Sequence, residues 1–147
     1  MLTETLIKLF NRDLSKIIEE INLYNDETNI WKIDGLIANS SGTLVLHLLA
    51  NLNHFIGSIL GNTGYVRDRG AEYELRDIPK LELIKQLEDT IVVIENTLSN
   101  ITIEDLQAEY KPQVFKEPMT TEYFLVHLAS HLAYHLGQIN YHRRLLD

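Results

Sequence analysis

The stretch TTEYFLVHLASHLAYHLGQINYHRRLLD, from Thr120 to Asp147, decides the fold of this chain and contains four of its six histidines. At about 100° per residue, a helix places these histidines within one stripe of roughly 80°. The stripe consists of His127, His131, His135, Gln138 and His142. A separate apolar stripe consists of Leu125, Leu128, Leu132, Leu136 and Ile139. The pattern predicts a long helix with one face for packing and one for coordination.

Histidines four residues apart on a helix lie one turn apart, so their ring nitrogens can reach one metal ion. His131 forms such a pair with His127 or with His135, and the spacing alone leaves both pairs open. A third ligand must come from another part of the chain.

Within the stretch from Thr120 to Asp147, the residues from Tyr123 to His142 include no Asp, Glu, Lys or Arg. A second uncharged run, from Gly35 to Val66, contains the other two histidines. It predicts a helix over 41–60 with a polar stripe of Thr43, His47, Asn51, His54 and Ser58. These polar residues interrupt the run too often for a membrane span, which needs about 20 apolar residues. His47 and His54 lie about 10 Å apart along a helix axis, so only one of them can bind a given ion directly. The helices without charge therefore hold all the histidines.

The rest of the chain predicts an all-α fold, a four-helix bundle in one domain over residues 1–147. Apolar periodicity predicts further helices over 2–24 and from Pro79 to Leu98, with Asp77 as cap of the latter. The glycine-rich, charged segment 61–78 is long enough to cross the length of a helix. We therefore expect a crossover between helices 2 and 3.

Four smaller expectations concern single side chains. Trp31, with Ile33 and Leu36, is expected to fold back over one end of the core. Asp13, at the edge of an apolar stripe, is expected to be solvated, and Gly137 is expected to allow close helix approach. Tyr134 and Tyr141 are expected to form walls of a cleft.

Composition excludes several functions. The 147 residues carry a net charge of −8 and no stretch of basic density, which argues against nucleic acid or an anionic membrane as partner. The chain has no cysteine, so thiol chemistry would require sulfur from a small molecule. The first residues lack the order of a signal peptide, so a cytoplasmic location is expected.

The segments HLAYHLGQI (131–139) and NSSGTLVLHL (39–48) resemble the DinB/YfiT-like superfamily of small bacterial four-helix-bundle metalloproteins. The similarity covers nearly the whole chain, including the helix order and the HxxxHxGQ pattern. It implies that the metal ligands are His47, His131 and His135. His54, His127 and His142 lie outside that pattern and are assigned to the surroundings of the site, the cleft lining or the core.

Three neutral imidazoles leave coordination positions open, which is typical of catalytic metal sites. Zinc is the first choice, and nickel or iron(II) would also accept three nitrogen ligands. The resemblance implies metal-dependent transfer of a low-molecular-weight thiol to an electrophilic small molecule. A hydrolase using metal-bound water and a non-catalytic metal-binding protein are the alternatives. Apolar surface on the first or third helix would support a homodimer.

Overall fold

The computed structural model describes all of residues 1–147 and consists of helices joined by loops, without a strand. The all-α prediction is confirmed. The long helices are α1 (Leu2–Leu23), α2 (Ser41–Leu52), α4 (Lys80–Leu98) and α6 (Thr121–Leu146). The short ones are η1 (Glu27–Trp31), η2 (Asn53–Ser58), α3 (Arg69–Glu74) and α5 (Ile103–Gln107).

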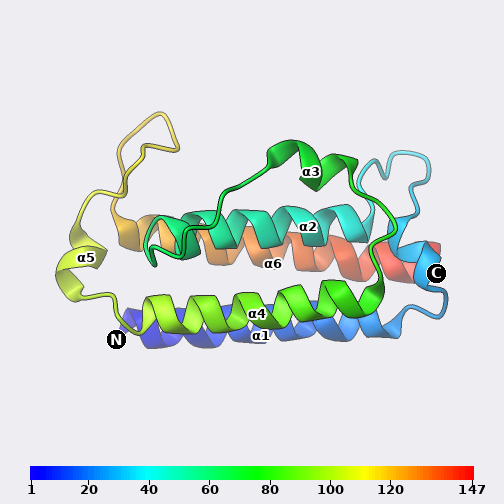
Figure 1. Ribbon diagram of the computed structural model, residues 1–147, viewed down its shortest axis with the longest axis horizontal. Coiled ribbons are helices and arrows are strands. Elements are labelled where there is room, and N and C mark those ends of the chain that lie inside the picture. Colours follow the sequence, from blue (N-terminus) through cyan, green and yellow to red (C-terminus); the bar gives the residue numbers. More distant parts are fainter.

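The four long helices lie side by side along the long axis of the molecule (Figure 1). Helix α1 packs on α4 and α6, and α2 packs on the same two helices. In Figure 1, α1 and α6 run in one direction and α2 and α4 in the other. The segment between α2 and α4 therefore returns along the molecule, and α3, which belongs to it, packs on α2.

The core is built from apolar stripes at helical spacing. On α1, the stripe is fully buried and consists of Leu6, Phe10, Leu14, Ile17 and Ile21. Opposite it, α4 buries Leu83, Leu87, Ile94 and Leu98. Burial of each such side chain stabilises the fold by about 1.5–3 kcal/mol. These contacts fix α1 and α4 as the rigid layer on which α2 and α6 lie.

Helix α2 is buried on almost every side, which explains its lack of charge. Its N-cap is Ser40, whose Oγ accepts a hydrogen bond from Thr43 N at 3.1 Å. Of the residues in α2, only His47 is not buried. The His47 imidazole is therefore the one side chain of α2 that is partly accessible from outside the bundle.

The predicted helix over 41–60 does not continue as an α-helix to its end. From Asn53 to Ser58 it widens into a π-helix. Ile59 N donates to His54 O at 3.0 Å and Gly61 N donates to Ile56 O at 2.9 Å, both across five residues. A π segment shifts the register of the residues that follow and often marks a functional site. The polar stripe predicted through His54 and Ser58 is therefore displaced.

Several of the smaller expectations were wrong. Asp13 is only 4% exposed and pairs with Arg12 Nε at 2.7 Å, so this carboxylate is buried instead of solvated. Trp31 is buried as predicted, but Ile33 and Leu36 are exposed because the chain turns outward after η1.

The start of α4 and the role of Gly137 also differ from expectation. Asp77 adopts a positive φ of 58° and does not cap the helix, which begins after Pro79. Lys80 N donates instead to Glu27 Oε1 at 2.7 Å. No atom lies within 4 Å of the Cβ position of Gly137, so this glycine permits no close helix approach.

No helix of the chain has both the length and the apolar character that crossing a bilayer requires.

Candidate metal centre

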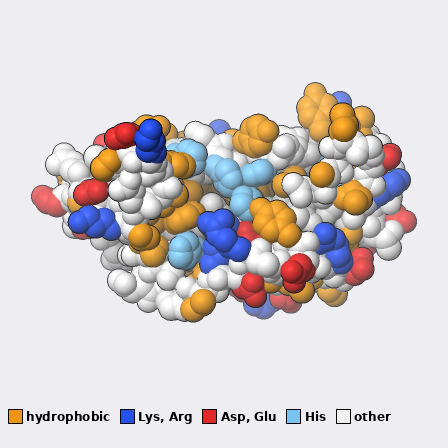
Figure 2. Space-filling view, turned by 90° about the horizontal axis from the view of Figure 1, so that it is seen from above, with side chains coloured by type: hydrophobic (Ala, Val, Ile, Leu, Met, Phe, Trp, Pro, Cys, Tyr) orange, Lys and Arg blue, Asp and Glu red, His pale blue; other side chains and the backbone are white.

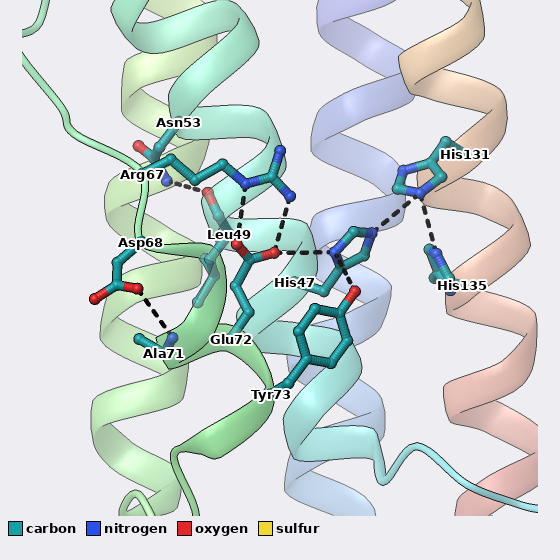
Figure 3. Close-up of polar contacts among 10 residues, drawn as sticks. All are labelled: His47, Leu49, Asn53, Arg67, Asp68, Ala71, Glu72, Tyr73, His131 and His135. Carbon is teal, nitrogen blue, oxygen red and sulfur yellow. Dashed lines mark hydrogen bonds and ion pairs between the residues drawn. The ribbon is translucent and has the colours of Figure 1, made fainter.

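Three histidines meet between α2 and α6. His47 comes from the middle of α2, and His131 and His135 come from successive turns of α6. His131 Nε2 lies 3.3 Å from His47 Nε2 and 3.1 Å from His135 Nε2. Figure 3 shows the three rings pointing toward one another across the gap between the two helices. Helical spacing brings the α6 pair together, and the packing of α2 on α6 adds the third ring.

The separations between these nitrogens fit a metal ion. All three ligand atoms lie within 4.8 Å of one another. Zn–N bonds of about 2.0–2.1 Å in a tetrahedral site place two ligand nitrogens roughly 3.3 Å apart. The donor set of three imidazoles suits zinc, nickel and iron(II). The residues present can therefore hold one divalent ion with at least one position left for another ligand.

Glu72 holds the His47 ring from behind. Its Oε1 lies 3.0 Å from His47 Nδ1, and its side chain is almost fully buried. An ionised carboxylate can only accept a hydrogen bond, so Nδ1 carries the proton and the lone pair of His47 is on Nε2, which faces the other two rings. Glu72 therefore selects the tautomer that metal binding requires.

Glu72 is supplied by the short helix α3 on the segment between α2 and α4. Asp68 caps this helix by accepting from Ala71 N at 3.1 Å. Arg67 binds both oxygens of Glu72, through Nε at 3.0 Å and Nη2 at 2.8 Å. Tyr73 Oη lies 3.4 Å from His47 Nδ1 (Figure 3). Sequence reasoning missed this group, although an N-cap residue such as Asp68 followed by an acidic residue in the first turn, here Glu72, is a helix-start signal.

His135 is oriented in the same way by its neighbour on α6. Its Nδ1 lies 2.6 Å from Gln138 Oε1, so Nδ1 donates and Nε2 carries the lone pair. Gln138 therefore orients the His135 ring. His131 Nδ1, by contrast, is buried without a hydrogen-bond partner.

The electrostatic environment keeps the His47 and His131 rings neutral. Burial lowers the pKa of His131 to about 4, and the neighbouring His135 and His47 contribute to the same shift. Burial also lowers the pKa of His47, although the hydrogen bond to Glu72 opposes it. Burial alone would raise the pKa of Glu72, but hydrogen bonds from Arg67 and His47 leave it lowered. At neutral pH His47 and His131 are therefore unprotonated and Glu72 is ionised, as metal binding needs.

Comparison with known protein families shows to which family the chain belongs. Residues 3–147 match the model of a family described as "Protein of unknown function (DUF1572)". The chain belongs to the DUF1572 family. This family is DinB-like, in agreement with the resemblance noted from the sequence. No curated protein matches the chain.

The other three histidines of this DUF1572 family member lie outside the triad. His142 is 3% exposed, and its Nε2 donates to Lys32 O at 2.7 Å while Tyr24 Oη lies 2.6 Å from Nδ1. It is a core residue. His127 stacks on Phe124 with ring centroids 6.0 Å apart. His54 packs edge-on against Phe55.

His135, alone of the triad, borders a cavity of about 580 Å³ between α6 and the loop before α2. Its lining includes His135 and Gln138 together with Tyr134 and Tyr141, as predicted for the cleft walls. On the face seen in Figure 2, histidine side chains gather in a hollow beside basic side chains. His135 therefore lies beside a cavity with room for a small molecule.

Proposed function

We propose that this protein binds one divalent metal ion through His47, His131 and His135 and transfers a small thiol to an electrophilic small molecule. Zinc is the first choice of metal, with nickel and iron(II) as alternatives. The arrangement of α1, α2, α4 and α6 supports the four-helix bundle with a long crossover on which this assignment rests.

One observation carries the proposal: the Nε2 atoms of three rings from two helices converge, and two of these rings have a Nδ1 partner that keeps Nε2 unprotonated. The lone pairs of His47 Nε2 and His135 Nε2 both face His131 Nε2, where one N–H could satisfy only one of them, whereas a cation would satisfy all three nitrogens. A purely structural cluster would place donors opposite acceptors. The donor set therefore supports a metal site over a packing role.

A divalent ion held there would stabilise the thiolate form of a small thiol at an open position. The chain itself positions the reactants: Glu72 and Gln138 fix the rings, and Tyr134 and Tyr141 flank the cavity beside His135 that would receive the electrophile. In the transfer, sulfur forms a bond to the electrophilic carbon, the leaving group departs with its bonding electrons, and the thiol proton passes to solvent. Because the chain has no cysteine, no protein thiol competes.

Hydrolysis is the second candidate, and it lacks a general base. Glu72 is the carboxylate bonded to the triad, and its oxygens already accept from Arg67 and His47. No Asp or Glu is present from Gly35 to Val66 or from Tyr123 to His142. Glu72 already accepts hydrogen bonds from Arg67 and His47, and it lies on the Nδ1 side of the His47 ring. It therefore cannot activate a water molecule on the Nε2 side, where the ion would be held.

The cavity, the net charge and the exposed residues of α4 indicate what the protein binds. The substrate is a small molecule, since the opening beside His135 is a cavity of about 580 Å³. The net charge of −8 disfavours nucleic acid. Exposed Leu81 and Val92 on α4 support a homodimer through that helix, which an analytical ultracentrifugation run would test.

The experiment that tests the function compares protein loaded with zinc, nickel or iron(II) with metal-free protein. Consumption of an electrophile such as monobromobimane is measured with and without added cysteine, in the wild type and in His131→Ala. The proposal expects enzymatic turnover that needs both metal and thiol and is absent in the variant. Turnover of an ester without thiol would favour the hydrolase. No turnover by fully loaded protein would favour a non-catalytic role.

A further inference from the structure

Arg67 carries a hydrogen-bond donor that the protein leaves unused. The side chain is only 6% exposed, and its Nε and Nη2 are both bound to Glu72. Its Nη1 is buried and has no partner. A buried guanidinium nitrogen without an acceptor is costly, since desolvation is not repaid. Figure 3 shows the guanidinium beside the gap between α2 and α6, on the same side of α2 as Glu72.

Unsatisfied polar atoms are concentrated around the triad. The chain has four buried side-chain polar atoms without a partner, and they are Asn11 Oδ1, Asn51 Oδ1, Arg67 Nη1 and His131 Nδ1. All except Asn11 belong to the triad or to the elements that surround it. Asn51 lies one helical turn after His47, on the same face of α2. Such groups are normally paired in folded proteins, so the free donor of Arg67, whose partner Glu72 contacts the triad, indicates a polar ligand.

The surroundings of Arg67 are apolar and aromatic. The guanidinium carbon lies 5.7 Å from the centroid of the Phe55 ring. Phe55 packs edge-on against Phe124 at 5.0 Å, and His127 stacks on Phe124. A site of this kind, with one cation over an aromatic wall, strengthens a charge-assisted hydrogen bond because water is excluded.

We propose that Arg67 Nη1 binds a carboxylate group of the small molecule that occupies the metal centre. The proposal rests on the proposed function, in which that molecule is the thiol. Glu72 joins the two sites, because its Oε1 lies 2.8 Å from Arg67 Nη2 and 3.0 Å from His47 Nδ1. To reach Arg67, a ligand bound at the triad thus needs to extend only past the His47 ring and the Glu72 carboxylate.

The charges of the site select a carboxylate over a phosphate. Glu72 already neutralises Arg67, so the guanidinium can offer directional donors but little net charge. A divalent ion with neutral imidazoles would leave two positive charges, which one thiolate and one carboxylate neutralise. A doubly charged phosphate in addition to a thiolate would leave buried negative charge uncompensated.

The test compares two thiols that differ only at the far end, 4-mercaptobutanoate and 4-mercaptobutan-1-ol. Their dissociation constants are measured by calorimetry on zinc-loaded protein whose metal content has been verified. We expect the wild type to bind the acid about tenfold more tightly or better, as for a charge-assisted hydrogen bond. Equal affinities would overturn the proposal.

The variant arm removes the donor without leaving a buried unpaired charge. In the double variant Arg67→Gln, Glu72→Gln we expect the ratio of the two dissociation constants to fall to about one. Glu72→Gln alone should keep the preference for the acid, and so should Arg76→Gln, a control at an exposed position. A preference that survives in the double variant would contradict the proposal, because direct chelation of the metal would then explain it.

A separate measurement distinguishes failure of the proposed function from failure of this subsite. If neither thiol binds zinc-loaded protein, the transferase proposal fails, and butanoate is then titrated into metal-free protein and compared with butan-1-ol. Shifts of the Arg67 and Asn51 side-chain NMR signals by butanoate alone support the subsite. Signals that do not move with either compound overturn it.

Discussion

Glu72 Oε1 lies 3.0 Å from His47 Nδ1, although the two residues are 25 positions apart and belong to different helices. This contact ties the segment between α2 and α4 to the histidine triad. The segment does more than connect two helices, because it supplies the group that sets the tautomer of one ligand. Arg67, from the same segment, binds that group in turn.

Replacing Glu72 should weaken metal binding without removing it. For Glu72→Gln we expect roughly tenfold lower zinc affinity, and for Glu72→Ala up to about 100-fold, the usual range for the partner of a metal-bound histidine. Competition with a chromophoric chelator measures both. Glu74→Gln, an exposed change on the same helix, serves as the control. Wild-type affinity in Glu72→Ala would show that Glu72 does not support the site.

The depressed pKa of His131 predicts how the metal-free protein responds to acid. Unfolded His131 takes up its proton near 6.5, whereas the folded pKa is about 4, so the unfolded chain binds more protons between these values. Stability should therefore be constant above about pH 6.5 and fall as the pH is lowered toward 4. Urea midpoints at pH 7 and pH 5 should differ more in the wild type than in His131→Gln. Equal differences would contradict the assignment.

Variants of His142 and His127 distinguish effects on folding from effects on metal binding. Because His142 is buried between Tyr24 and the Lys32 carbonyl, His142→Ala should cost about 2–4 kcal/mol of unfolding free energy. Its metal content, measured on folded protein, should stay at one ion per chain. His127→Ala should also keep its metal. Loss of the ion from either variant would mean that the triad is assigned incorrectly.

Two glycines should respond to alanine in opposite directions. At Gly42, a Cβ would lie 2.6 Å from ring atoms of the buried Trp31, so Gly42→Ala should destabilise by about 1–3 kcal/mol. At Gly137, in the middle of α6, the Cβ position is free, and Gly137→Ala should stabilise by about 0.5–1 kcal/mol. Thermal unfolding measures both, and shifts of the same sign would refute the contrast.

Helical periodicity explains why much of the fold and the triad could be predicted. The stripes of α1 and α6 repeat at helical spacing, and a histidine pair one turn apart is fixed by local geometry. The absence of charge on α2 is explained by burial, because all of this helix except His47 is enclosed. Choosing His47 over His54, and His135 over His127, required the family resemblance.

The parts that could not be predicted depend on contacts between distant residues. Glu72 and Arg67 lie on a charged segment without periodicity, and only the packing of α3 on α2 brings them to His47. The π-helix after Leu52 changes the register of His54, and no local sequence signal marks it. Asp13 appeared to be a boundary residue, but it is buried beside Arg12.

The central claim is that one cation lies between three imidazoles, and metal analysis of protein purified without a histidine tag tests it most directly. We expect one divalent ion per chain in the wild type and almost none in His131→Ala or His47→Ala, with circular dichroism showing that both variants remain helical. A wild-type protein that stays metal-free after incubation with zinc, nickel and iron(II), or variants that retain a full ion, would contradict the account.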